Sequence, residues 1–439
     1  MNPSVRGECY MVPIVVLCIF IISYILLITE TWDRMLVAGA GGVAMLIVGA
    51  FTIHDALFTY IDWKTIALLF AMMLIVSITS QTGFFEYIAI RLAQMVRGDG
   101  ILLLILFFLL SAVGSAFLAN VTVAMLIVPI LFTLTRLLQL PPTPYMIATI
   151  LSCNIGGTAT LIGDPPNMMI GQTVQHLTFN AFLQNLLPVV LLIMFITILL
   201  IAVLYREQLY VKREKQLLLA GIRAANYLKK EKGLYPSIIV LSMVMLGFML
   251  YPLLHLDVTT VALAGAVLLL LLLQRVYQPE EVLKQVEWGT IFFFIGLFLI
   301  VGGLEEAGFI DELARSIIRI TEGDMVKTSL FILWSTGILS AFIDNIPFVA
   351  AMIPVLQEFQ EIGIMHMDPL WWSLALGACL GGNGTLLGSS SNLVIAGLAA
   401  REQAPVSFRE YLWIGMPIMF LSLIISTIYV YVRYLLPFM

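Results

Sequence analysis

The second half of this chain repeats the first half in a single register. Five pairs of identical residues each stand 225 positions apart, and these are Trp63 and Trp288, Asn120 and Asn345, Pro129 and Pro354, Gly163 and Gly388, and Asn167 and Asn392. Residues 63–167 therefore align on residues 288–392 without a net gap. A fixed internal period means that one structural unit has been built twice. Because the matched positions include glycine-rich polar stretches, the fold must accommodate an irregular backbone in both copies.

The composition places these repeats in a membrane. Of the 439 residues, 61% are hydrophobic and 11% are charged, and the mean hydropathy is +1.03. Soluble domains carry about 25% charged residues, so the chain is predicted to be a helical protein that crosses the membrane several times. The first apolar run, 12–29, is too long for a signal peptide and lacks its small-residue cleavage pattern, so it is expected to be a retained helix.

Ten segments are long and apolar enough to be membrane spans. They are 12–29, 34–51, 63–82, 144–178, 180–205, 235–254, 257–274, 288–306, 370–400 and 409–436, and glycines and prolines break 144–178 and 370–400. Two further apolar stretches, 101–138 and 327–357, have Asn120 and Asn345 near their centres. Each stretch either dips into the membrane and returns as a hairpin or crosses it twice. The number of crossings is even in both cases, so the choice does not change the orientation of the later segments.

The basic residues indicate which side of the membrane is cytoplasmic. Segment 206–232 carries 8 of the 22 lysines and arginines, so the positive-inside rule places this linker in the cytoplasm. Five crossings separate the start of one repeat from the start of the other, and because five is odd the repeats enter the membrane from opposite sides. The amphipathic segments 84–96 and 309–320, which follow the first span of each repeat, suit helices at the membrane interface.

These features predict an all-α polytopic membrane protein with inverted-topology repeats, two re-entrant hairpins and two broken transmembrane helices. The predicted divisions are N-terminal scaffold helices over 1–51, a first repeat over 52–205, a basic cytoplasmic linker over 206–234, further scaffold helices over 235–285 and a second repeat over 286–439. Hairpin 101–138 and broken helix 144–178 belong to the first repeat, and hairpin 327–357 and broken helix 370–400 belong to the second.

The two broken segments carry the strongest candidate site. Residues 156–167 read GGTATLIGDPPN and residues 381–392 read GGNGTLLGSSSN, which cannot form a continuous helix. An unwound backbone at membrane depth must be buried in protein or line a cavity, and its helix ends attract polar solutes. Glycine runs also permit close helix packing, which is the alternative. Two runs in register favour binding, and the candidate residues are Thr158, Thr160, Pro165, Pro166, Asn167, Asn383, Thr385, Ser389, Ser390, Ser391 and Asn392.

The predicted hairpin tips, 119–122 and 344–347, supply the other half of this site. Their candidate binding residues are Asn120, Thr122 and Asn345. Short polar side chains at a turn cap the half-helices, and the same groups can coordinate a solute. Two tips that meet two broken helices from opposite faces are expected to form one site near the midplane with approximate two-fold symmetry.

Two acidic residues break the symmetry of the repeats, because Asp164 aligns with Ser389 and Asp344 aligns with Ala119. An ionisable residue inside the membrane is costly and is a functional candidate by default. No lysine or arginine lies within either motif, so Asp164 and Asp344 are predicted to carry protons, with capping of a half-helix as the alternative. Two carboxylates without a basic partner favour a cation or a neutral hydroxylated solute over a multivalent organic anion.

The remaining chemically distinctive residues are weaker candidates. The four cysteines have no disulfide or zinc spacing, and Cys153 and Cys379, which precede the two Gly-Gly breaks, are expected to pack more than to bind a soft metalloid. All four histidines, His54, His176, His255 and His366, are expected in solvated loops at the outer ends of spans. Trp63, Trp288, Trp371 and Trp372 are predicted to anchor the chain at the membrane interface.

The runs at 156–167 and 381–392 resemble the two signatures of one branch of the ion transporter superfamily, which holds the arsenite efflux permeases and the melanosomal P protein. The resemblance covers about residues 35–437, and citrate and dicarboxylate transporters are more distant relatives. It implies elevator-type movement of the site against a scaffold and allows a homodimer. It also implies binding roles for Asn120, Asp164, Asn167, Asp344, Asn345 and Asn392.

The most specific hypothesis is proton-coupled efflux of arsenite or antimonite, because arsenite is mostly an uncharged trihydroxide at neutral pH. The alternatives are Na⁺/H⁺ antiport, transport of small carboxylates such as citrate or dicarboxylates, and a passive channel. No nucleophile–base spacing, metal motif or phosphate-binding loop indicates an enzyme, and neither a cofactor nor a nucleic acid is expected. The predicted partners are the lipid bilayer, the solute and a coupling ion (protons or Na⁺), and the predicted location is the inner or plasma membrane. Whether an ATPase subunit docks on the linker stays open.

Overall fold

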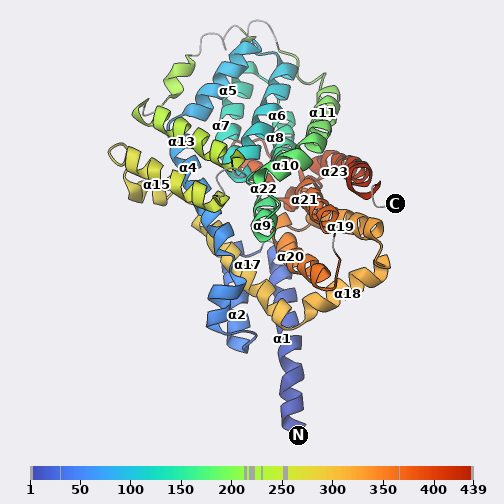
Figure 1. Ribbon diagram of the computed structural model, residues 1–439. Coiled ribbons are helices and arrows are strands. Elements are labelled where there is room, and N and C mark those ends of the chain that lie inside the picture. The colour runs from blue at the N-terminus through green and yellow to red at the C-terminus, as the bar shows by residue number, and fades with distance from the viewer. Residues whose placement is uncertain are drawn as a thin grey trace.

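The structure is a computed structural model that describes residues 3–29, 31–211, 215–216, 223–228, 231–250, 256–364 and 366–436. Within these ranges every regular element is helical, as predicted, and no strand is present (Figure 1). Seven of the described helices are long and apolar enough to cross a membrane. The predicted linker at 206–232 lies partly outside the described residues.

The second N-terminal helix forms a pair with the first helix of the second repeat. Helix α1 (Pro3–Thr29) leads into α2 (Arg34–Val48), which packs lengthwise on α17 (Trp288–Glu306). The two backbones approach closely, because a Cβ atom added to Gly296 would lie 2.4 Å from the carbonyl carbon of Ala38. The Asp33 carboxylate caps α2 by accepting from the backbone N–H groups of residues 35 and 36.

Each repeat contains a helical hairpin that turns inside the protein. In the first repeat α6 (Gly100–Phe117) and α7 (Asn120–Leu138) form the hairpin, and in the second α19 (Met325–Ser340) and α20 (Asn345–Glu361) do so. An amphipathic helix precedes each one, α5 (Phe84–Met95) or α18 (Phe309–Thr321). Figure 1 shows α5 toward the upper end of the molecule and α18 toward the lower end, as expected for inverted repeats.

The same glycine geometry starts both amphipathic helices. Gly83 and Gly308, which are equivalent in the repeat register, precede α5 and α18 with φ angles of 76° and 77°. Glycine adopts this left-handed conformation without the strain that a Cβ atom adds, which favours it at both turns. The repeats therefore share local backbone geometry as well as helix order.

Both predicted breaks are present in the helices that follow the hairpins. Helix α8 (Thr143–Gly157) ends at an unwound segment, and α9 (Pro165–Thr173) continues beyond it. In the second repeat α21 (Asp368–Gly381) is followed by the 3-10 turn η3 (Leu386–Gly388) and then by α22 (Ser390–Arg401). These segments lie at the centre of the molecule, where nearly every side chain of α8 and α21 is buried.

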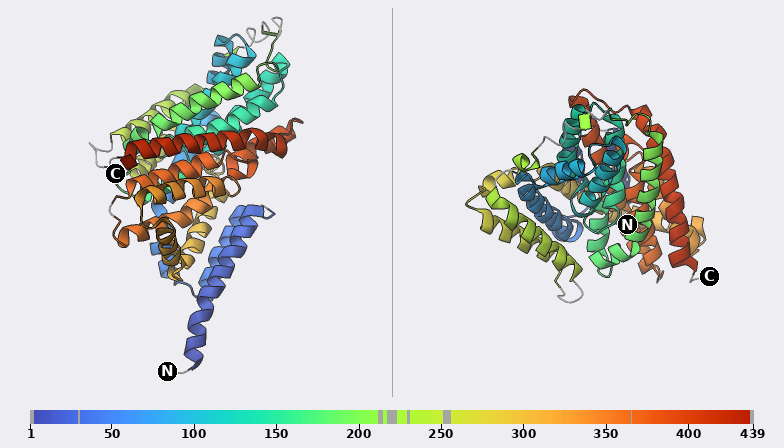
Figure 2. Two further views of the ribbon diagram at one scale, coloured as in Figure 1. Left: turned by 90° about the vertical axis from the view of Figure 1, so that its right-hand side faces the viewer. Right: turned by 90° about the horizontal axis from the view of Figure 1, so that it is seen from above.

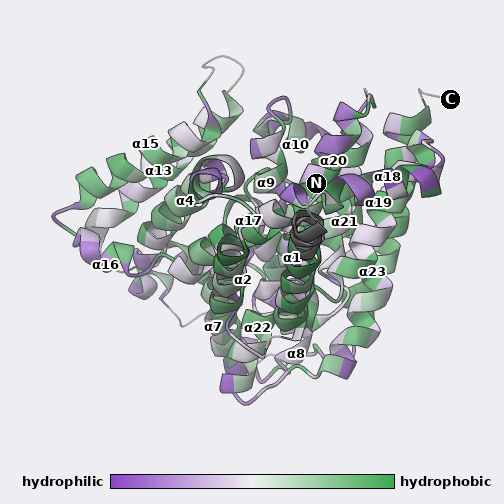
Figure 3. Cartoon of the chain, turned by 90° about the horizontal axis from the view of Figure 1, so that it is seen from below, coloured by the Kyte–Doolittle hydropathy of each residue, from purple (hydrophilic) through white to green (hydrophobic). Residues whose placement is uncertain are grey.

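The remaining helices surround this centre. They are α3 (Ile53–Asp55), η1 (Ala56–Tyr60), α4 (Trp63–Gln81), α10 (Phe179–Asn185), α11 (Leu187–Leu204), η2 (Ala224–Tyr227), α13 (Glu231–Met249), α15 (Val258–Leu273), α16 (Pro279–Leu283), α23 (Phe408–Val430) and η4 (Tyr431–Leu435). In Figure 2 α11 and α23 run side by side along one flank. Phe195, Val203 and Ile428 on these two helices are more than half exposed, as suits helices in contact with lipid. Figure 3 shows that hydrophobic residues predominate along α23.

Two sequence-based expectations about these helices are wrong in detail. The predicted span 180–205 is divided at Leu186 into α10 and α11, because Pro188 has no backbone N–H to continue a helical ladder. Trp371 and Trp372 are not interface anchors, since their exposed fractions are 2% and 1%. They begin α21 inside the helix bundle, where the Trp372 ring meets Phe182 edge-on. Aromatic area can be buried in a core as readily as placed at an interface.

Candidate solute site

Two equivalent asparagines hold the unwound segments in shape. Asn167 Nδ2 donates to the carbonyl oxygens of Thr158 and Thr160 at 3.2 and 2.9 Å. Asn392 Nδ2 donates to the carbonyl oxygens of Gly382 and Thr385 at 2.8 and 3.0 Å. Both side chains are fully buried, so their N–H groups satisfy the carbonyls that the helix break releases. In this structure these N–H groups are therefore hydrogen-bonded to backbone carbonyl oxygens of the protein.

The threonines of the unwound segments are also bonded within the protein. Thr160 and Thr385, which are equivalent, donate their hydroxyls to the carbonyl oxygens of Ala116 and Ala341 in the adjacent hairpins. The Thr158 hydroxyl donates to the Asn154 carbonyl oxygen at 2.7 Å within its own helix. These bonds join each broken helix to the hairpin of its own repeat.

The glycines allow the close helix packing that was the alternative to solute binding, and the backbone unwinds beside them. A Cβ atom added to Gly156 would lie 2.1 Å from the Ala112 carbonyl oxygen, and one added to Gly381 would lie 2.5 Å from the Gly337 carbonyl oxygen. Real Cβ contacts are not this short, so at these two points α8 and α21 can approach α6 and α19 this closely only because glycine has no Cβ atom. The unwound backbone begins immediately after these contacts.

Asn154 joins the two repeats and was not recognised from the sequence. Its Nδ2 donates to Asn383 Oδ1 and Asn392 Oδ1, both at 3.0 Å. The equivalent residue of the second repeat is Cys379, whose thiol donates to Asn167 Oδ1 at 3.6 Å. Asn154 of the first repeat thus bonds Asn392 of the second, and Cys379 of the second repeat bonds Asn167 of the first. A polar amide within a mostly apolar helix, 143–157, is the signal that could have pointed to Asn154.

Asp164 lies at the junction between the repeats and is 2% exposed. It occupies the N-cap position of α9, but its side chain makes no capping bond, so the capping alternative is wrong. Asn345 Nδ2 instead donates to Asp164 Oδ2 at 3.0 Å, which brings the second hairpin tip against the first broken helix. The Cys379 thiol also neighbours this carboxyl group. Within the described part of the chain, no ion pair involves Asp164.

Asp344, by contrast, has a basic partner, which corrects the expectation drawn from the motifs. Arg34 Nη1 and Ser390 Oγ both donate to Asp344 Oδ2, and Arg34 Nη1 also donates to Ser390 Oγ. Arg34 stands 310 positions away in sequence, at the start of α2, so inspection of the motifs alone did not find it. The argument against organic anions from two unpaired carboxylates therefore fails at Asp344. This side chain does not cap α20 either.

The N-terminus of α9 offers few backbone N–H groups to an anion. Pro165 and Pro166 form its first turn and have no backbone N–H groups. The backbone N–H of Asn167 is bonded to the Asp164 carbonyl oxygen at 3.0 Å. At the equivalent start of α22, the Ser391 hydroxyl is within 3.0 Å of the Ser389 hydroxyl. Thr122, in the first turn of α7, is only half-buried.

Several buried polar atoms in this region have no hydrogen-bond partner in the described part of the protein. They are Asn120 Nδ2, Asn154 Oδ1, Asn383 Nδ2 and Asp344 Oδ1. The side-chain oxygen Asn120 Oδ1 is engaged, because Ser115 Oγ donates to it. A buried polar atom without a partner costs about 1–3 kcal/mol. Donors and acceptors from both tips and both broken helices are thus available to a polar solute.

Cavities adjoin this region at both ends of α17. The first cavity, of about 460 Å³, lies at the Trp288 end and is lined by residues that include Arg34, Glu287, Thr290 and Ser390. The second cavity, of about 500 Å³, reaches the other end of α17 and is lined by residues that include Lys64, Gln172, Glu305 and Gln357. Each cavity lies between the α2–α17 region and the hairpins or broken helices.

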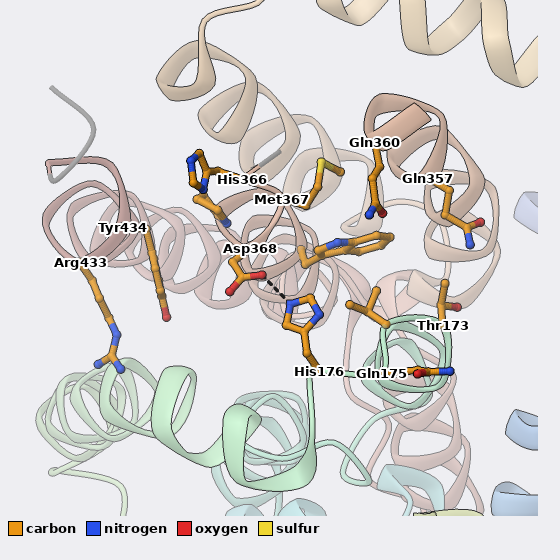
Figure 4. Close-up of a pocket in the computed structure, with 13 residues that line it drawn as sticks. Thr173, Gln175, His176, Gln357, Gln360, His366, Met367, Asp368, Arg433 and Tyr434 are labelled. Carbon is orange, nitrogen blue, oxygen red and sulfur yellow. Dashed lines mark hydrogen bonds and ion pairs between the residues drawn. The ribbon is translucent and has the colours of Figure 1, made fainter. Parts of the chain in front are cut away.

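A third cavity, of about 670 Å³, contains none of the predicted site residues (Figure 4). Its walls come from the ends of α9, α20 and η4 and from the start of α21. His176 Nε2 lies 2.7 Å from Asp368 Oδ1 and thereby links the two broken helices at this end. His366 also lines this cavity, whereas His255 lies outside the described residues.

The fold and the site define a multi-pass membrane transporter with inverted repeats. The chain belongs to the citrate transporter family (CitMHS), whose model matches residues 24–377. An uncharacterized transporter of Mycobacterium tuberculosis is 37% identical over 96% of this chain and 98% of its own length. The P protein of Homo sapiens is 32% identical over 94% of this chain and 59% of its own length. The predicted branch of the ion transporter superfamily is thereby confirmed.

A solved structure shares the fold. The YdaH transporter of Alcanivorax borkumensis superposes with a TM-score of 0.56 over 88% of this chain and 87% of its own, with 14% sequence identity. At this identity the likeness concerns architecture alone. The family and the architecture together establish a secondary transporter.

Proposed function

We propose that this protein is a proton-coupled exporter of a small uncharged hydroxylated solute, with arsenite or antimonite as the best-fitting examples. The observation that carries the proposal is Asp164, a buried carboxyl group at the junction of the repeats that is bonded to the neutral amide of Asn345. A carboxyl group without a cationic partner in a low-dielectric site readily takes up and releases a proton. It is therefore suited to be the proton carrier.

The surrounding groups suit a neutral solute. The unpartnered atoms are amide N–H groups and carbonyl or carboxylate oxygens, and no described basic residue pairs with Asp164. A trihydroxide can donate to oxygens and accept from amides at the same time, which a bare cation cannot do. The Arg34–Asp344 pair is neutral as a unit, so it does not require an anionic solute.

We propose further that the hairpins and broken helices move as one body against the α2–α17 region in an elevator mechanism. Two features support this. The broken helices bond to their own hairpins and to each other, through Thr160, Thr385 and Asn154, which makes one cohesive unit. The first and second cavities lie at opposite ends of α17, on the boundary between that unit and the scaffold.

A second candidate is transport of a small carboxylate such as citrate. It is favoured by Arg34, which places a guanidinium at the second hairpin tip, and by the description of the matched family. Guanidinium groups bind carboxylates through charge-assisted hydrogen bonds. In this mechanism the solute carboxylate would compete with Asp344 for Arg34. Exchange of Na⁺ for protons through the same acidic residues is a third outcome of the test below.

The test uses purified protein in liposomes with an acidic interior, offered arsenite, citrate and Na⁺ in separate assays. Uphill arsenite accumulation that a protonophore abolishes is the expected result, and citrate or Na⁺ accumulation alone would move the assignment to the corresponding candidate. Asp164→Asn keeps the side-chain shape and should abolish the uphill component. Asp368→Asn, an exposed carboxyl group in the third cavity, is the control and should transport normally. Uphill transport by Asp164→Asn at the wild-type rate would show that Asp164 is not the proton carrier.

A further inference from the structure

Arg34 belongs to the pair of helices α2 and α17, which pack on each other beside the candidate site. It is the first residue of α2, whose long contact with α17 passes through Gly42 and Gly296. A Cβ atom at Gly42 would lie 2.9 Å from Leu299 Cβ, so the two helices form a tightly packed pair. Arg34 nevertheless reaches out of this pair to the second hairpin tip.

The tip of the second hairpin is held by both N-terminal helices. Arg34 donates to Asp344 and to Ser390, and the Tyr24 hydroxyl of α1 donates to the Pro347 carbonyl oxygen at 2.8 Å. The side chains of Arg34 and Asp344 are 25% and 10% exposed. A partly buried ion pair with further hydrogen bonds couples its two elements more firmly than an exposed pair does.

The first hairpin has no equivalent contact. The residues that correspond to Asp344 and Ser390 in the first repeat are Ala119 and Pro165, which offer neither a carboxylate nor a hydroxyl. The contact is therefore specific to one of the two repeats, and in a molecule with inverted repeats it is specific to one end. Arg34 and Ser390 line the first cavity and not the second.

We propose that Arg34 is a positioning residue of the transport cycle. It holds the second hairpin tip against α2 while the solute site adjoins the first cavity, and this contact must break before the site can open to the second cavity. The inference rests on the proposed elevator movement, and it adds a named scaffold residue that stabilises one of the two end states. Arg34 acts through Asp344 and Ser390 and need not touch the solute.

The test measures the exposure of the two cavities without any solute. Reporter cysteines replace Leu393 in the first cavity or Gln172 in the second, in full-length protein in which Cys9 and Cys18 are serine. Their rates of reaction with a water-soluble maleimide are compared in detergent, after subtraction of the parent that lacks a reporter. Arg34→Gln should lower the rate at Leu393→Cys at least threefold and raise the rate at Gln172→Cys by a similar factor.

Four further variants make this result specific. Asp344→Asn should shift both rates as Arg34→Gln does, and the double variant should shift them no further, because both variants break the Arg34–Asp344 contact. Arg34→Lys keeps the charge and should restore most of the wild-type pattern. Arg136→Gln removes the exposed ion pair with Glu402 and should change neither rate.

Two outcomes would overturn the proposal. One is unchanged labelling at both reporters in Arg34→Gln, and the other is an additive effect of Arg34→Gln and Asp344→Asn. Because the measurement requires no transported solute, it can succeed even if arsenite, citrate and Na⁺ all prove not to be transported. Failure of the proposed function and failure of this inference are therefore distinguishable.

Discussion

Replacement of Asn154 by alanine is expected to loosen the junction between the two repeats. Asn154 Nδ2 donates to Asn383 Oδ1 and to Asn392 Oδ1 at 3.0 Å, and all three side chains are fully buried. Alanine removes both bonds and leaves two buried carbonyl oxygens without these donors. Lipid chains offer no hydrogen-bond donor, so the membrane does not replace the lost bonds.

The size of the effect follows from these contacts. Hydrogen bonds between membrane helices contribute about 0.6 kcal/mol each on average, which sets a lower limit near 1 kcal/mol for two bonds. A buried acceptor left unsatisfied costs about 1–3 kcal/mol, which sets an upper limit near 6 kcal/mol for two. We expect Asn154→Ala to lower the free energy of unfolding by about 2–4 kcal/mol, between these limits. Asn154→Cys should lose less, because Cys379 makes the equivalent bond through its thiol at 3.6 Å.

Unfolding by sodium dodecyl sulfate in mixed micelles, followed by tryptophan fluorescence, measures this free energy. Ser152→Ala is the matched control, because this buried hydroxyl lies in the same helix and donates to the Thr149 carbonyl oxygen within that helix. It should cost about 1 kcal/mol or less. If Asn154→Ala unfolds at the same detergent fraction as Ser152→Ala, the amide bonds between the repeats do not stabilise the junction and the reasoning is refuted.

The same titration checks two further predictions. Gly156→Ala should destabilise by about 3 kcal/mol or more, because the new Cβ meets the Ala112 carbonyl oxygen at 2.1 Å, whereas Gly397→Ala has nothing within 4 Å and should stabilise by up to about 1 kcal/mol. Equal effects of the two glycine variants would contradict the packing argument. Tyr411→Phe should cost about 1 kcal/mol, because the hydroxyl that donates to the Asn383 carbonyl oxygen at 2.9 Å is lost; a stability unchanged from wild type would show that this bond contributes nothing.

The positions of the candidate site along the chain were predictable because they depend on local chemistry and on the repeat. Glycine and proline interrupt a helix wherever they occur, so the breaks after Gly157 and Gly381 follow directly from the residues. The register of 225 residues then pairs Asn167 with Asn392, and the structure gives both the same carbonyl-bonding role. Which side chains remain available to a solute did not follow, because each amide can bond to protein or solute equally well.

The sequence by itself determined the membrane class, the inverted repeats and the broken helices, since these follow from hydropathy, parity and backbone chemistry. It left open whether 101–138 and 327–357 each turn back as a hairpin or cross the membrane twice, because both have the same parity. Only the tertiary structure decided the partners of the buried polar groups. Asp344 was expected to be unpaired until the fold brought Arg34 to it across 310 positions, and Asn154 was overlooked because its partners lie in the other repeat. A buried polar group must be satisfied by whatever the fold places beside it, and that neighbour is set by helix packing, not by proximity in sequence.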